Sequence, residues 1–131
     1  MFHDSHAFSG FSTNDIEKAR QFYGETLGLD ITEHMGVLNV TFAGGGTTVI
    51  YPKDNHEPAT FTVLNFPVDD IDAAVDRLVA AGITMERYEG LGQDERGIAR
   101  EYPPLIAWFK DPAGNILSVL ESGRSSNEGA P

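Results

Sequence analysis

Apolar residues recur with a helical period in two segments of the chain. In the second and clearer segment they fall at positions i, i+3, i+4, i+7 and i+8, which places all of them on one side of a helix: Ile71, Ala74, Val75, Leu78 and Val79. In the first segment the inner face carries Ile16, Ala19, Tyr23 and Leu27. Asn14 and Asp69 are natural N-caps, and Gly28 and Gly82 suit the C-terminal ends. The pattern therefore predicts two amphipathic helices, each buried along one stripe.

Shorter apolar and β-branched runs predict strands on both sides of each helix. One strand precedes each helix, at residues 7–11 and 61–66. Three strands follow the first helix, at residues 29–34, 37–42 and 47–51, and three follow the second, at 84–88, 105–109 and 115–120. Each half of the chain therefore predicts a β-α-β-β-β unit.

The two halves also share a short sequence repeat. Phe11 and Ile16 recur as Phe66 and Ile71, in both cases 55 residues later (66 − 11 and 71 − 16), with an aspartate at matching places between them. Such self-similarity indicates an internal duplication. We expect a single domain over residues 1–131, with modules at about 6–52 and 60–121, the polar segment "PKDNHEPAT" as a short linker, and a disordered tail at 122–131.

Composition narrows the classes of partner. The 131 residues include no cysteine, which excludes disulfides and thiol chemistry, and the chain has no long apolar run or signal-like start, so we expect a cytoplasmic protein that does not enter the membrane. The net charge of −11 repels phosphate backbones, which argues against nucleic acid and favours cationic small molecules.

Two motifs carry a resemblance to a known family. The first half holds Ala19-x-x-Phe22-Tyr23 followed by Leu27-Gly28-Leu29, and the second holds Phe109-x-Asp111-Pro112-x-Gly114-Asn115. In this order the chain resembles the vicinal oxygen chelate (VOC) superfamily, which includes glyoxalase I, extradiol dioxygenases, and the fosfomycin and bleomycin resistance proteins. The resemblance implies an α+β fold, in which two tandem βαβββ modules form a curved mixed sheet around a cup-shaped cavity, and it implies a homodimer.

The metal ligands that this resemblance implies are missing. In the family pattern one ligand lies seven residues before the aspartate that opens each helix, and another lies four residues after the turn glycine. In this chain those positions are occupied by Phe8, Val63 and Ser118, with Ile50 as the match of Ser118 in the first half when Gly46 is aligned with Gly114. Three apolar side chains and a neutral hydroxyl do not hold a divalent ion. We therefore expect no metal and no other cofactor.

The same residues are candidates for lining a ligand cavity, since small-molecule sites are mostly apolar with a few polar groups. The expected lining is Phe8, Ile50, Val63, Trp108, Ser118 and His6. Trp108 and Phe109 must point to opposite sides of their strand, and the sequence leaves open which one enters the cavity. The charged segment 89–104, with Arg96 and Arg100, is either a lid or a plain surface loop.

Three functions remain open at this stage. The leading one is metal-independent binding or sequestration of a small molecule, of the glyoxalase/bleomycin resistance type. The alternative is a divalent-metal lyase, isomerase or dioxygenase with displaced ligands such as His6 and Glu101, for which Glu33, His34 and His56 are further candidates. The third is a scaffold whose cup is filled by its own side chains.

Overall fold

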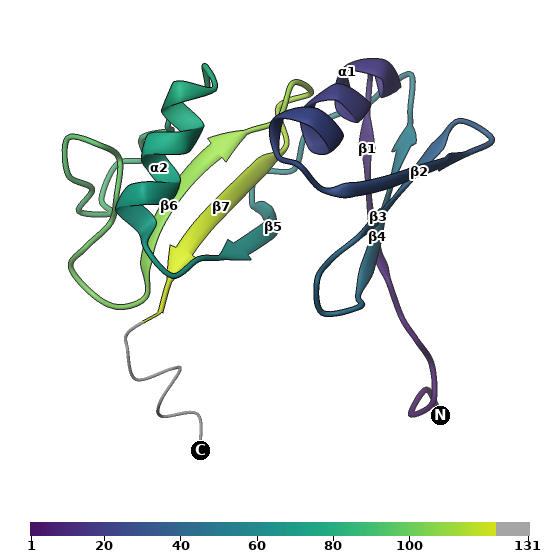
Figure 1. Ribbon diagram of the computed structural model, residues 1–131, viewed down its shortest axis with the longest axis horizontal. Helices are drawn as coiled ribbons and strands as arrows, with labels where there is room; N and C mark the ends of the chain where they lie inside the picture. Colours follow the sequence, from purple (N-terminus) through teal and green to yellow (C-terminus); the bar gives the residue numbers. More distant parts are fainter. Residues whose placement is uncertain (123–131) are drawn as a thin grey trace. The chain divides into compact units, whose positions relative to one another are not determined.

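The computed structural model describes residues 1–122, so the tail expected to be disordered lies almost entirely outside the described residues. The chain divides into two compact units, Met1–Pro58 and a second that begins at Ala59 (Figure 1). This boundary falls inside the polar segment predicted as a linker. None of the helices formed by residues 1–122 is long and apolar enough to cross a bilayer.

The first unit is a four-stranded mixed sheet with one helical segment. In chain order its elements are β1 (Ser9–Thr13), α1 (Ile16–Arg20), the π-helical η1 (Gln21–Thr26), β2 (Asp30–His34), β3 (Val37–Thr41) and β4 (Thr47–Pro52). The strands lie in the order β1-β4-β3-β2, with β1 parallel to β4 and the other pairs antiparallel. Helix α1 packs on β3 and β4, so one face of the sheet forms the core of this unit.

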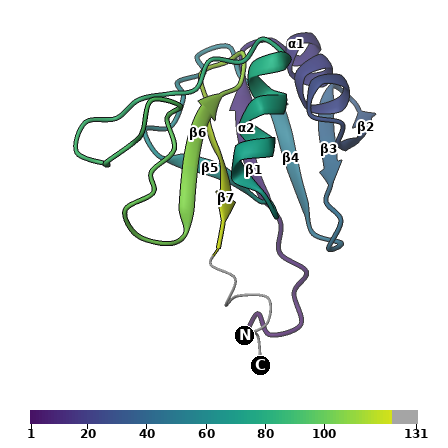
Figure 2. The same cartoon turned by 60° about the vertical axis from the view of Figure 1, so that its left-hand side comes forward.

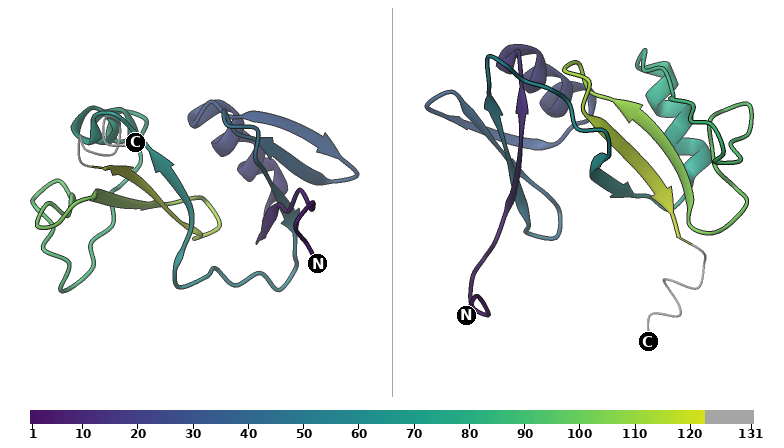
Figure 3. Two further views of the ribbon diagram at one scale, coloured as in Figure 1. Left: turned by 90° about the horizontal axis from the view of Figure 1, so that it is seen from below. Right: turned by 180° about the vertical axis from the view of Figure 1, so that it is seen from behind.

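The second unit is a three-stranded mixed sheet with one helix. Its elements are β5 (Thr62–Pro67), α2 (Ile71–Ala80), β6 (Leu105–Lys110) and β7 (Ile116–Glu121), and the strands lie in the order β5-β7-β6. Helix α2 contacts β6 and β7 (Figures 2 and 3). The side chains beneath it are almost completely buried: Ala107, Phe109, Leu117 and Val119. The α+β fold of two modules is thus confirmed.

The prediction of a strand at residues 84–88 is wrong, because this segment is irregular. It makes one backbone hydrogen bond to β6, from Glu86 N to Trp108 O at 2.8 Å. Side chains hold the remainder: the Tyr88 amide donates to Gln93 Oε1 at 2.7 Å, and the Arg87 guanidinium donates to the carbonyl of Asp94 at 2.7 Å. Residues 84–88 include a β-branched and an aromatic residue, which favour strands, but local bonds to side chains take the place of the sheet's hydrogen bonds.

The helix caps lie one residue later than predicted. The side chain of Asp15, not Asn14, accepts from the Lys18 amide, and that of Asp70, not Asp69, accepts from the Ala73 amide. In both cases the donating amide is three residues further on, which is the reach of an N-cap side chain. The first residue of α2, Ile71, donates its amide to Glu121 Oε1 at the end of β7, at 2.8 Å.

The buried stripe of α2 is narrower than predicted. Ile71, Val75 and Leu78 are buried, whereas Val79 is 55% exposed. Eight residues of helix turn about 80° past two full turns, so a position at i+8 lies to the side of the residue that starts the stripe. In the first helix Ala19 and Tyr23 are buried as predicted, and Phe22 joins them, with its ring centroid 5.1 Å from that of Tyr23.

The cap assignment predicts unequal effects for two adjacent aspartates. Asp70→Ala should lower the free energy of unfolding by about 1 kcal/mol, because the start of α2 loses an acceptor. Asp69→Ala is the matched control and should change it by less than about 0.5 kcal/mol, as for an ordinary exposed side chain. Urea denaturation followed by circular dichroism measures both, and a larger effect for Asp69 would contradict the assignment.

Candidate functional site

The turn between β6 and β7 is organised by one carboxylate. Asp111 Oδ1 accepts from the amides of Ala113 at 2.9 Å and Asn115 at 2.8 Å, while its Oδ2 accepts from Asn115 Nδ2 at 2.9 Å. Asp111 and Asn115 are 5% and 2% exposed. Gly114 has φ of +88°, a conformation in which glycine is favoured. The turn therefore determines how the two strands pair.

The strand pairing places Ser118 between one aromatic and one polar neighbour. Trp108 of β6 lies opposite Ser118 on one side, and Asn65 of β5 lies opposite it on the other. Leu117 and Val119 pair with Phe109 and Ala107, the residues of β6 that are buried beneath α2. Ser118 therefore faces the other way. We call this side of the second unit, with Asn65, Trp108 and Ser118, the serine face.

The serine face is uncharged at its centre. Ser118 is fully buried, and its hydroxyl donates to Asn65 Oδ1 at 2.6 Å. Asn65 itself is exposed. The pairing also answers which aromatic residue packs under the helix: Phe109 is 1% exposed on the α2 side, and Trp108 lies on the serine face. Ile106, Ile116 and Leu120 share this face and are half-buried.

Tyr88 extends the aromatic part of the serine face. Its ring meets that of Trp108 edge-on, with centroids 5.6 Å apart and an interplanar angle of 83°. Burial and, to a lesser degree, the nearby Glu86 carboxylate raise the pKa of the Tyr88 phenol. The phenol is therefore a protonated donor at neutral pH. The sequence did not indicate Tyr88, because its position was predicted to lie at the end of a strand.

In the first unit, the residue that corresponds to Ser118 lies one position before the predicted Ile50. Phe42 N donates to Gly46 O and Gly45 N donates to Phe42 O, both at 2.9 Å, which repeats the bonds between Asp111, Gly114 and Asn115. Gly45 thus corresponds to Gly114, and the residue four positions on is Val49. Ile50 lies instead on the α1 side of the sheet, where it is fully buried and pairs with Leu38.

The other predicted lining residues lie in different surroundings. Val63 is the extra residue of a β-bulge, since Thr62 pairs with Ile116 and Leu64 pairs with Leu117. His6 and Phe8 precede β1 in the first unit and are exposed, Phe8 by 65%. Of the six predicted residues, the structure brings Trp108 and Ser118 together.

The donor set at these positions does not fit a divalent ion. Ser118 offers a neutral hydroxyl that already donates to an amide oxygen, and Val49 offers no donor atom. Two of the alternative ligands have other partners: Glu33 pairs with Arg20, and His56 Nδ1 lies 2.6 Å from Ser12 Oγ. Within residues 1–122 no group of three or more histidines, aspartates and glutamates is arranged to hold a metal.

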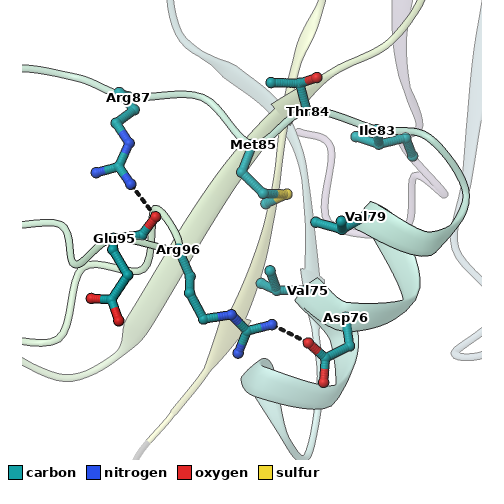
Figure 4. Close-up of a pocket in the computed structure, with 9 residues that line it drawn as sticks. All are labelled: Val75, Asp76, Val79, Ile83, Thr84, Met85, Arg87, Glu95 and Arg96. Carbon is teal, nitrogen blue, oxygen red and sulfur yellow. Dashed lines mark hydrogen bonds and ion pairs between the residues drawn. The ribbon is translucent and has the colours of Figure 1, made fainter.

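Ion pairs connect the charged segment 89–104 to α2. Arg96 pairs with Asp72 and Asp76 of the helix, and Arg100 bridges Asp72 and Asp94. Beside these ion pairs lies a pocket of about 510 Å³, shown in Figure 4. Its lining is mixed, with apolar and charged side chains: Val75, Asp76, Val79, Ile83, Thr84, Met85, Arg87, Glu95 and Arg96. Arg96 and Arg100, the two arginines of the charged segment, are thus engaged in ion pairs on the α2 side.

Asp94 is the centre of this segment. Its Oδ1 accepts from the amides of Arg96 and Ile98, both at 2.9 Å, and its Oδ2 accepts from Arg100 Nε at 2.8 Å. Burial alone would raise the pKa of the Asp94 carboxyl, but these hydrogen bonds outweigh it and hold the pKa below its ordinary value. The ionised carboxylate therefore stabilises the segment.

Comparison with known proteins identifies relatives. The family model described as Glyoxalase/Bleomycin resistance protein/Dioxygenase superfamily matches residues 6–119. No curated protein matches the chain. Among solved structures, TnmS3, an antibiotic binding protein from Streptomyces sp. CB03234, is similar with a TM-score of 0.70 and 25% identity, over 94% of this chain and 100% of that chain.

Two further structures show the range of similar proteins. A glyoxalase/bleomycin resistance protein from the same Streptomyces strain has a TM-score of 0.59 and 27% identity, over 87% of this chain and 99% of that chain. The fosfomycin resistance protein FosX from Mesorhizobium loti has a TM-score of 0.64 and 13% identity, over 93% and 95%. At 13% identity the likeness shows the fold alone.

The hydrogen bonds of Asp94 predict a local and pH-dependent effect. Asp94→Ala should increase amide hydrogen exchange at residues 93–100 by about tenfold or more, because two amides lose their acceptor. In the wild type the protection should be fully present above the ordinary pKa of about 4 and be lost as the pH falls through the lowered pKa of the folded state. Hydrogen exchange, corrected for the intrinsic rate at each pH, measures both. Glu95→Ala is the control, and an equal effect there would contradict the role of Asp94.

Proposed function

The chain belongs to the glyoxalase/bleomycin resistance protein/dioxygenase superfamily, and from this premise we propose that it binds and sequesters a small molecule without a metal ion. The observation that carries the proposal is the pair formed by Ser118 and Asn65. At the position where the family pattern places a metal ligand on the last strand, this chain has a buried serine whose hydroxyl is already used. A neutral pair beside aromatic rings suits recognition of an organic ligand better than coordination of a cation.

Aromatic contact area on the serine face supports this function. Trp108 and Tyr88 meet edge-on there, and three half-buried aliphatic side chains surround them. Large aromatic side chains commonly contribute most of the energy of a binding site. Asn65 is exposed, so its amide can bind polar groups of a ligand at the border of this face.

The charge and the relatives suggest the class of ligand. A net charge of −11 raises the local concentration of cationic molecules. TnmS3 is described as an antibiotic binding protein, and its identity with this chain is 25% over nearly the whole of both. We therefore propose a cationic or neutral aromatic antibiotic as the ligand. We also propose a cytoplasmic homodimer, as the family resemblance implies.

Titration with antibiotics tests the binding function. Metal-free bleomycin and a panel of other cationic antibiotics should include a compound that binds saturably in isothermal titration calorimetry. Because Trp108 is the sole tryptophan of the chain, the same ligand should change its fluorescence. Trp108→Leu should weaken binding by about thirtyfold, the usual effect of removing a central aromatic contact.

Val79→Ala is the matched control for this titration, because Val79 lines the pocket beside α2 and not the serine face. It should leave the affinity unchanged. Weaker binding by the Val79 variant with normal binding by the Trp108 variant would place the ligand in that pocket. A panel in which no compound binds would remove the antibiotic proposal.

Metal analysis tests the rival function, a divalent-metal lyase, isomerase or dioxygenase with displaced ligands. Protein purified without chelator should contain far less than one equivalent of divalent metal. Zinc, nickel, manganese or ferrous iron should not raise its melting temperature, because only ligands that bind the native state stabilise it. One bound equivalent, together with a higher melting temperature, would favour the metal enzyme.

A further inference from the structure

The Tyr88 hydroxyl is buried, and among residues 1–122 it is the buried side-chain group for which no hydrogen-bond partner is found. Most buried polar groups in folded proteins have a partner, since an unpaired one loses its bonds to water without compensation. Tyr88 lies against Trp108, at the proposed binding face. An unpaired donor in this position can therefore pair with a ligand once the ring moves enough to expose it.

The backbone around Tyr88 is held without any help from its hydroxyl. Gln93 Oε1 accepts from the Tyr88 amide, while Gln93 Nε2 donates to Glu86 O at 2.9 Å and Gly97 O at 2.8 Å. The Gln93 side chain thus bonds the backbone on both sides of its own position, at Glu86 and Tyr88 before it and at Gly97 after it. The position of the ring follows from these bonds and from contact with Trp108. The hydroxyl makes no bond that holds the ring in place.

The segment also has some freedom to adjust. It makes a single backbone hydrogen bond to β6, between Glu86 and Trp108, whereas the strands of the sheet are bonded along their length. Segments with few backbone bonds open more easily than strands within a sheet. A small movement of the Tyr88 ring can therefore present its hydroxyl to a bound molecule.

The surroundings select the chemistry of that molecule. The phenol stays protonated at neutral pH and therefore donates. Glu86 lies close enough to act on it electrostatically, and although Lys110 is 3.7 Å from Glu86, the chain as a whole carries −11. An anionic acceptor is disfavoured in this field, whereas a neutral carbonyl oxygen is not.

We propose that Tyr88 is a specificity-determining residue, whose hydroxyl donates a hydrogen bond to a neutral carbonyl oxygen on an aromatic ligand packed against Trp108. The inference rests on the proposed binding function and deepens it. It divides aromatic ligands into two groups: those with a carbonyl oxygen in reach of Tyr88 and those of the same shape without one.

A matched pair of probes tests this role. 7-Methoxycoumarin carries a ring carbonyl, and 2-methoxynaphthalene has nearly the same shape without it. Quenching of Trp108 fluorescence measures the affinity of each. Tyr88→Phe keeps the ring contact and removes the hydroxyl, so it should weaken coumarin binding by about tenfold and leave naphthalene binding unchanged. Tyr102→Phe, which alters a phenol that is 76% exposed, is the control and should change neither.

The ligand-free protein gives a second measurement. Tyr88→Phe should leave the melting temperature unchanged or raise it, because the substitution removes an unpaired buried group. A lower melting temperature would show that the hydroxyl is already bonded within the protein, and would overturn the inference. Equal coumarin affinities of the wild type and the Tyr88 variant would overturn the role of Tyr88 while the binding function stands. If neither probe binds either protein, and the antibiotic panel also fails, the binding function itself falls and the inference with it.

Discussion

The Asp111 carboxylate is the constraint on which the chemistry of the second unit depends. By accepting three hydrogen bonds inside the turn, it sets the pairing of β6 with β7. Side chains alternate along a strand, so a slip of β6 by one residue against β7 would move Trp108 under α2 and bring Phe109 out onto the side of Ser118. The same shift would disrupt the core and the serine face together. A buried turn thus maintains both the core of the unit and the serine face.

Much of the fold could be predicted from periodicity and from paired motifs, and the errors have definite causes. The two helices, the two turns and most strands follow from patterns that are local in sequence. Residues 84–88 do not form a strand because the side chain of Gln93 bonds their backbone, and no local sequence pattern reports such bonds. The caps were misplaced by one residue because Asn14 and Asp69 are as suitable chemically as Asp15 and Asp70, and only the start of the helix decides between them.

For the candidate site, spacing along the chain locates residues relative to the turns but does not decide which side of a strand each residue faces. Ser118 could be found from its spacing to the turn, whereas the choice between Trp108 and Phe109 requires the pairing of the strands. Ile50 follows from aligning Gly46 with Gly114, but three successive glycines allow more than one alignment, and the hydrogen bonds of the turn favour Gly45 as the match. Val63 could not be placed because a bulge interrupts the alternation of β5. Tyr88 is recognisable only once the burial of its hydroxyl is known, since no sequence pattern reports an unpaired donor.

The two sides of the second unit differ in their electrostatics. On the α2 side, Arg96 and Arg100 neutralise carboxylates of the helix and of Asp94 in a connected set of ion pairs. On the serine face the central groups are neutral. The charged segment therefore supports the unit from the side opposite to the proposed ligand, and its arginines are not available to attract or repel it.

The bond between Ser118 and Asn65 also bears on how this protein can evolve. A carboxylate at position 118 would be buried without a cationic partner, so the first step toward a metal enzyme would lower stability before any metal site existed. Substitutions of exposed side chains that pair with no buried group meet no such barrier. Under the proposed function, the range of ligands can therefore change by single substitutions at exposed positions, while metal binding requires several changes at once.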